Sequence, residues 1–177
     1  MRILKTYLNE IVLIQINNFR DIRGDFLKLY SFVELNKLKI NHKCKESYIS
    51  TSKKGTIRGM HYDLLSAKNS KLIYCNKGKI FDVILDIRKK SSNFGKFVTI
   101  NLNEKDNKLI YIPYGFAHGF QALKNQTEVL YFSSAPYNPT KERGVLWNSF
   151  GCKWPMTDKN KIFLSNKDKQ HIDLINK

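Results

Sequence analysis

The stretch KLIYCNKGKIFDVILDI, residues 71–87, decides the fold class. Two apolar runs, 71–75 and 80–87, flank the turn sequence NKGK, in which Gly78 supplies the backbone freedom of a tight reversal. Similar runs follow at short intervals, separated by turns that contain asparagine, glycine or proline: residues 96–102, 108–112, 118–123 and 128–133. Short strands at this spacing predict an all-β protein, an antiparallel sandwich or barrel with a few short helices.

Helical periodicity is weak elsewhere in the chain. We expect one short helix at 31–36 and a turn or two in the polar tail that begins at Asn166. The length of 177 residues and the hydrophobic fraction of 42% fit a single domain, residues 1–177, with a sizeable core.

Composition restricts the compartment and the partners. No apolar run approaches the roughly eighteen residues of a membrane span, and residues 1–13 lack the cleavage site of a signal peptide. The formal charge of +16 would attract polyanions, but the lysines are scattered and accompany no known nucleic-acid-reading motif. Cys44, Cys75 and Cys152 are odd in number and form no Cys-x-x-Cys pair. We therefore expect a cytoplasmic protein that binds neither membrane nor nucleic acid.

The candidate chemistry centres on two of the four histidines. His61 lies in IRGMHY (57–62) and His118 in IPYGFAHGF (112–120), both strand-rich segments that contain glycine. In a regular strand Arg58 would point away from the face of His61, because side chains alternate. A bulge at Gly59 would return both to one face and place a cation beside an imidazole.

Several ordered segments resemble the family of dTDP-4-dehydrorhamnose 3,5-epimerases and their relatives, from about residue 15 to about residue 168. The matching segments are FRDIRGDF (19–26), GTIRGMHYD (55–63), KL (71–72), GKIFDVILDIRKKSSNFGKF (78–97), IPYGFAHGFQAL (112–123), VLYFSSAPYNP (129–139), ERGVLWN (142–148) and LSNKD (164–168). The resemblance implies a jelly-roll cupin barrel, a homodimer, and an active site without metal or cofactor. The sequence also lacks the His-x-His pair typical of metal-binding cupins.

The activity that the resemblance implies is epimerisation at C3, C5 or both of a nucleotide-diphosphate 4-keto-6-deoxy sugar, for surface polysaccharide synthesis. A ketone at C4 makes the hydrogens on C3 and C5 removable, because the remaining charge delocalises onto the ketone oxygen. By resemblance, His61 is the general base, Asp168 orients it, and Tyr131 is the acid on the opposite face. Lys71, helped by Arg58, would stabilise the enolate.

Other positions match residues that hold the substrate in the related enzymes. Tyr137 would stack on the nucleotide base, and the remaining matches are Arg23, His118, Glu142 and Lys167.

The departures from the family pattern concern the nucleotide. Lys28 stands where the family usually has Glu, Glu46 and Tyr48 where it has Gln and Asn, and Asp63 where it has Gln. Lysine donates well to the paired acceptors O6 and N7 of guanine. The substrate is therefore expected to be either dTDP-4-keto-6-deoxyglucose or a GDP-linked 4-keto heptose, with Lys28, Glu46 and Tyr48 contacting it.

Two other functions fit the same barrel. A 3,4-ketoisomerase would place its acid and base differently, and the matches at Tyr131 and Asp168 argue against it. A non-catalytic sugar-nucleotide-binding cupin would be expected to lose His61 or Lys71, and both are present.

Overall fold

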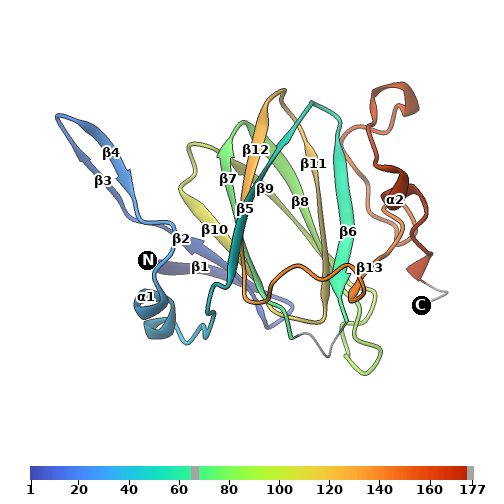
Figure 1. Cartoon of the computed structure of the whole chain (residues 1–177), viewed down its shortest axis with the longest axis horizontal. Coiled ribbons are helices and arrows are strands. Elements are labelled where there is room, and N and C mark those ends of the chain that lie inside the picture. Colours follow the sequence, from blue (N-terminus) through green and yellow to red (C-terminus); the bar gives the residue numbers. More distant parts are fainter. Residues whose placement is uncertain (65–67, 175–177) are drawn as a thin grey trace.

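The chain forms two antiparallel β-sheets that face each other, as the computed structural model of residues 1–64 and 68–174 shows (Figure 1). The six-stranded sheet has the order β1-β2-β10-β7-β12-β5, and the five-stranded sheet has the order β13-β6-β11-β8-β9; β3 and β4 pair with each other as a separate two-stranded sheet. The strands are β1 Arg2–Tyr7, β2 Ile11–Gln15, β3 Asn18–Asp21, β4 Gly24–Leu27, β5 Glu46–Ser52, β6 Ile57–Asp63, β7 Lys71–Lys77, β8 Lys79–Asp86, β9 Phe97–Asn103, β10 Lys108–Ile112, β11 Phe116–Ala122, β12 Thr127–Ser133 and β13 Glu142–Gly144. The prediction of an all-β antiparallel barrel is confirmed.

The turn at Gly78 joins the two sheets and does not pair the strands on either side of it. β7 belongs to the six-stranded sheet and β8 to the five-stranded one. Gly78 has a φ of +83°, and a Cβ there would lie 2.5 Å from Oγ1 of Thr127, so only glycine fits this crossing.

The main core fills the space between the sheets. It is built from inward-facing side chains of both, because residues along each strand alternate between core and exterior. Ile73 and Val129 of the six-stranded sheet and Ile84 and Phe120 of the five-stranded sheet are completely buried. This packed layer fixes the strands whose remaining inward side chains line the site.

The predicted bulge in β6 is present. His61 pairs with His118 of β11 and Arg58 with Phe120, so the register shifts by one residue between these pairs. At Gly59, φ is +117°, and a Cβ would lie 2.6 Å from Cα of Gly119. The extra residue re-aims the strand, and Arg58 and His61 line the same pocket as expected.

The helices are short, as the sequence predicts. Helix α1, Phe32–Lys37, begins after Ser31, whose side chain accepts a hydrogen bond from the Glu34 N–H. Helix α2, Asn166–Lys169, is capped in the same way by Ser165, and a 3₁₀ turn, η2, spans Lys159–Lys161. Nowhere in residues 1–64 and 68–174 does a helix have the length and apolar character needed to cross a membrane.

The C-terminal segment lies beside β6 and β13 at the edge of the five-stranded sheet (Figure 1). Thr56 forms a β-bridge with Phe163, and Val145 forms one with Ile172. These two anchors hold α2 against β6, so that a residue far away in the sequence, Asp168, reaches the site.

Candidate active site

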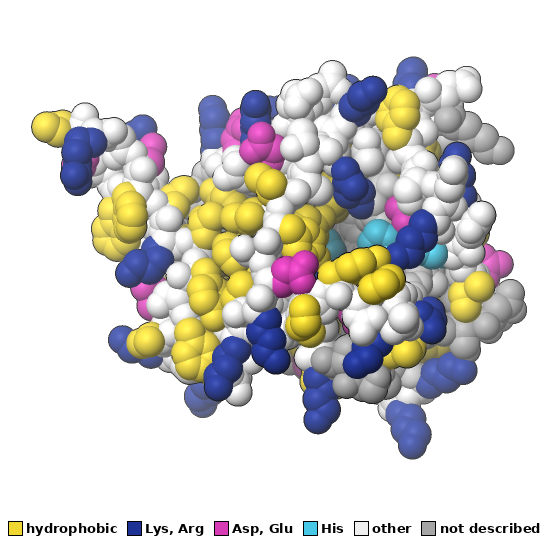
Figure 2. Space-filling view, in the orientation of Figure 1, with side chains coloured by type: hydrophobic (Ala, Val, Ile, Leu, Met, Phe, Trp, Pro, Cys, Tyr) yellow, Lys and Arg dark blue, Asp and Glu magenta, His cyan; other side chains and the backbone are white. Residues whose placement is uncertain are grey.

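A pocket of about 340 Å³ opens between the sheets. Figure 2 shows histidine side chains at the bottom of this hollow, with charged side chains at its rim. Most of its lining residues project inward from β5, β6, β7, β11 and β12, and two more come from the loop after β12 and the start of β13. The full lining is Glu46, Tyr48, Ser50, Arg58, His61, Lys71, His118, Tyr131, Tyr137 and Glu142.

His61 and Asp168 form a hydrogen-bonded pair. Nε2 of His61 lies 2.8 Å from Oδ1 of Asp168, and the Gly59 N–H donates to Oδ2 at 3.3 Å. Burial raises the pKa of Asp168, but the bonds from His61 and Gly59 outweigh it and hold that pKa below its ordinary value. The carboxylate therefore stays charged, fixes the imidazole, and leaves Nδ1 as the basic nitrogen of His61.

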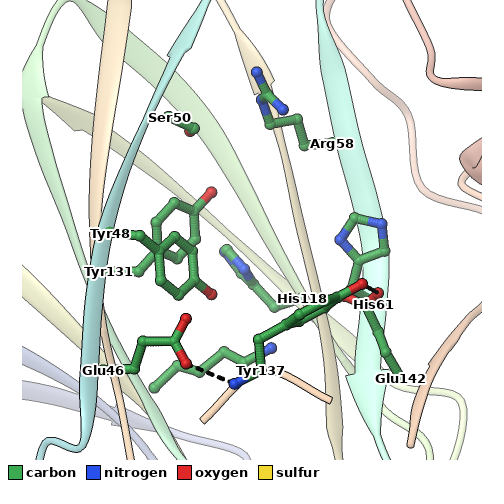
Figure 3. A pocket seen from close by; sticks show the side chains of 10 residues that line it. Glu46, Tyr48, Ser50, Arg58, His61, His118, Tyr131, Tyr137 and Glu142 are labelled. Carbon is green, nitrogen blue, oxygen red and sulfur yellow. Dashed lines mark hydrogen bonds between the residues drawn. The ribbon is translucent and has the colours of Figure 1, made fainter. Parts of the chain in front are cut away.

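Tyr131 stands across the pocket from His61 (Figure 3). It projects from β12, is 8% exposed, and stacks on Tyr48 of β5 with ring centroids 4.7 Å apart and planes inclined by 17°. Burial raises the pKa of Tyr131, and it raises the pKa of Tyr48 to about 12. Both phenols are therefore protonated at neutral pH and can donate a proton toward the pocket.

Two cations reach the pocket in different electrostatic settings. Nζ of Lys71 lies 3.4 Å from Oδ2 of Asp63. Arg58 is held by uncharged groups, since its Nε donates to Oγ of Ser52 and its NH2 group to the carbonyl oxygen of Thr51, each at 3.0 Å. Among the described residues, no carboxylate forms an ion pair with the guanidinium of Arg58.

A polar rim surrounds the mouth of the pocket. The backbone N–H of Tyr137 donates to Oε2 of Glu46 at 2.6 Å, and the Tyr137 hydroxyl donates to Oε2 of Glu142 at 3.4 Å. Lys167 forms an ion pair with the same Glu142 oxygen, which raises the pKa of that lysine. Tyr137 is 60% exposed, so its ring is free to pack on a planar group.

His118 lies on the floor of the pocket and is paired with a second carboxylate. Its Nε2 lies 2.7 Å from Oδ2 of Asp82, which is fully buried. Burial raises the pKa of Asp82, and the contact with His118 partly offsets that effect.

Two expected substrate contacts lie outside this pocket in the single chain. Arg23 is on the β3–β4 hairpin, which projects away from the barrel, and it pairs with Asp21 at 2.6 Å (Figure 1). Lys28 follows that hairpin, and its Nζ lies 3.8 Å from Oε1 of Glu34 on α1. The other expected residues either line the pocket or, like Asp168 and Lys167, touch a residue that does.

His171 was not expected in the site from the sequence. Its ring lies 5.4 Å from that of His61 at 85°, and its Nε2 is 3.9 Å from Oδ1 of Asp168. His61, Asp168 and His171 each offer a ligand atom, and these atoms lie within 4.8 Å of one another, so this cluster is able to hold a metal ion. A histidine three residues after a catalytic carboxylate, at one-turn spacing, was the available signal.

A small antiparallel barrel with a His–Asp pair facing a protonated tyrosine fits an isomerase that transfers protons to and from its substrate. A profile of the dTDP-4-dehydrorhamnose 3,5-epimerase family matches residues 5–176, and the chain belongs to this family. It is therefore an epimerase of nucleotide-sugar metabolism.

Individual relatives agree over nearly the whole chain. The chain is 36% identical to a dTDP-4-dehydrorhamnose 3,5-epimerase of Shigella flexneri, over 95% of this chain and 93% of the relative. The crystal structure of the Bacillus anthracis enzyme with TDP and pyrophosphate bound has a TM-score of 0.92, at 33% identity over 97% of this chain and 98% of that one. The Legionella pneumophila enzyme in complex with dTDP-4-keto-L-rhamnose also has a TM-score of 0.92, at 29% identity over 98% and 93%.

Proposed function

We propose that this epimerase inverts C3, C5 or both of a nucleotide-diphosphate 4-keto-6-deoxy sugar, for surface polysaccharide synthesis. The observation that carries the proposal is the placement of His61, backed by Asp168, across the pocket from Tyr131. A base and an acid on opposite faces of a planar enolate are what inversion requires, whereas a base alone returns the proton to the face that it left.

The proton path uses residues on both sides of the pocket. Nδ1 of His61 removes the hydrogen beside the C4 ketone, and Asp168 stabilises the imidazolium that forms. The electron pair moves onto the ketone oxygen, where Arg58 and Lys71 supply positive charge. Tyr131 protonates the carbon from the opposite face, and solvent exchange restores both side chains. The ketone itself delocalises the charge, so no cofactor is needed in this path.

We take dTDP-4-keto-6-deoxyglucose as the first candidate substrate. Support comes from the ligands bound in two related structures, TDP and dTDP-4-keto-L-rhamnose. A GDP-linked 4-keto heptose is the second candidate, because Glu46 lies in the pocket where the related enzymes usually carry an amide. A carboxylate accepts from N–H donors, and guanine presents an N2 amino group that thymine lacks.

We further propose a cytoplasmic homodimer. The β3–β4 hairpin exposes Phe19 and Phe26, 57% and 61% accessible, and β1 exposes Ile3 at 44%. A second copy of the chain would cover such apolar side chains and would bring Arg23 and Lys28 near a pocket. The three cysteines are all free, which supports a reducing compartment.

The test is incubation in deuterated water with each candidate sugar nucleotide in turn. Nuclear magnetic resonance and mass spectrometry then locate deuterium at C3 and C5 and identify the inverted centres. Deuterium at neither carbon with either substrate would refute the proposed reaction. Migration of the ketone to C3 would instead identify a 3,4-ketoisomerase.

A further inference from the structure

His171 lies next to the His61–Asp168 pair, and its two ring nitrogens form no hydrogen bond with the described residues. Its side chain is 7% exposed. The ring packs directly on Gly144, where a Cβ would lie 2.2 Å from it, so glycine is needed for the histidine to fit. Leaving a buried polar group unpaired is costly, so we expect these nitrogens to bind a group that the described residues do not supply.

The nearby atoms form the donor set of a transition-metal site. Nε2 of His61 and Nε2 of His171 lie 2.8 Å and 3.9 Å from the same oxygen, Oδ1 of Asp168. In a tetrahedral zinc site with bonds of about 2.1 Å, ligand atoms are about 3.4 Å apart. The two distances bracket this spacing, so small side-chain rotations bring all three atoms into range.

The site also has an entry path. A second hollow of about 340 Å³ lies beside His61 and is lined by Asp168, and the His61 side chain is 28% exposed. Two imidazoles and one carboxylate select zinc, cobalt or nickel over magnesium or calcium, which prefer oxygen ligands. Three protein ligands leave a fourth position for water.

We propose that His61, Asp168 and His171 bind a divalent transition-metal ion such as Zn²⁺, and that this ion inhibits the epimerase. The inhibition rests on the proposed role of His61. A metal bond to Nε2 of His61 displaces its hydrogen bond to Asp168 and keeps the proton of the neutral ring on Nδ1, the nitrogen that must be bare to remove a proton. Metal and catalysis therefore compete for one imidazole.

Metal binding to the chelator-treated protein tests the site without any turnover. Wild-type protein should bind one Zn²⁺ by calorimetry and should give with Co²⁺ the strong visible absorption of a four-coordinate ion. His171→Asn should weaken Zn²⁺ binding on the order of 100-fold, as loss of a ligand does. Cys44→Ser, which removes a partly exposed thiol elsewhere, is the control and should bind as the wild type does.

Activity supplies a separate readout. Zn²⁺ should inhibit the wild type at concentrations that leave His171→Asn at its own metal-free rate. Should His171→Asn not fold, His61→Asn removes another ligand and should weaken binding similarly. Absence of stoichiometric binding, or equal affinity in wild type and ligand variants, would overturn the site. Specific binding without inhibition would support the site and count against His61 as the base.

Discussion

Replacing Tyr131 by phenylalanine separates proton removal from inversion. The change deletes one hydroxyl from a ring that is 8% exposed and stacked on Tyr48. Ring volume is kept, so we expect the free energy of unfolding to change by only about 1 kcal/mol, the net value of one hydrogen bond. Since burial keeps the phenol protonated, its loss removes the proton donor of that face.

The expected kinetic effect is large for inversion and small for exchange. Loss of a general acid typically costs ~10²- to 10⁴-fold, which corresponds to about 3–5 kcal/mol of activation free energy. His61 and Asp168 are untouched in this variant, so deuterium should still enter C3 from deuterated water while net epimerisation nearly stops. Inversion at C5 should be lost most completely, because the sugar must shift for that carbon to meet the same pair of groups.

The assay follows deuterium at C3 and C5 by nuclear magnetic resonance and product configuration in parallel. Tyr48→Phe is the comparison variant, because it removes the other pocket phenol and leaves Tyr131 in place; it should still invert the sugar, although the loss of this expected substrate contact should raise KM. Inversion of both centres at the wild-type rate by Tyr131→Phe would show that water or another residue is the acid.

Three further outcomes are expected. His61→Asn should abolish deuterium incorporation at every carbon while nucleotide affinity is kept, and Asp168→Asn should cause a smaller loss; exchange at the wild-type rate in His61→Asn would rule it out as the base. If the substrate is GDP-linked, calorimetry at one ionic strength should show tighter binding of GDP than of dTDP, and Glu46→Gln should reduce this difference in affinity. Tighter binding of dTDP would instead favour dTDP-4-keto-6-deoxyglucose. Burial lowers the pKa of His42 from 6.5 to about 4, so between these pH values the unfolded chain binds a proton that the folded chain does not. The free energy of unfolding should therefore fall by up to roughly 3 kcal/mol as pH drops from 6.5 to 4. Urea unfolding at both pH values measures the free energy of unfolding, which should change less with pH in His42→Gln than in the wild type. An equal change in both proteins would show that His42 is not the group responsible.

Local sequence signals predicted the strands from β7 to β12 and the bulge in β6, because both depend on neighbouring residues, whereas they did not predict β1 to β5. The run 108–112 coincides with β10, and Gly59 marks the place where β6 changes register. The crossing at Gly78 was not specified by the sequence: a tight turn reads the same whether the flanking strands pair or enter different sheets. That choice depends on packing between the sheets, a long-range property.

In the site too, motifs predicted some residues, whereas others depend on contacts between segments far apart in the sequence. Motif resemblance identified most pocket residues, but His171 matched no motif, and only the folding of the C-terminal segment against β13 brings it to His61. Arg23 and Lys28 show the converse, since the resemblance assigns them to the substrate while a single chain holds them on a projecting hairpin or beside α1.

The charges around the pocket change which of its two cations, Lys71 or Arg58, is expected to stabilise the enolate more. The resemblance assigns enolate stabilisation first to Lys71, but Asp63, where related enzymes usually carry Gln, lies 3.4 Å from its ammonium group. Asn69 donates to the same carboxylate at 2.9 Å and holds it in place. A cation paired with a carboxylate presents little net field to a developing enolate, whereas Arg58, held only by neutral oxygens, keeps its full charge. In the proposed reaction we therefore expect Arg58 to be the stronger electrostatic partner of the ketone oxygen and Lys71 to act more as a positioned hydrogen-bond donor.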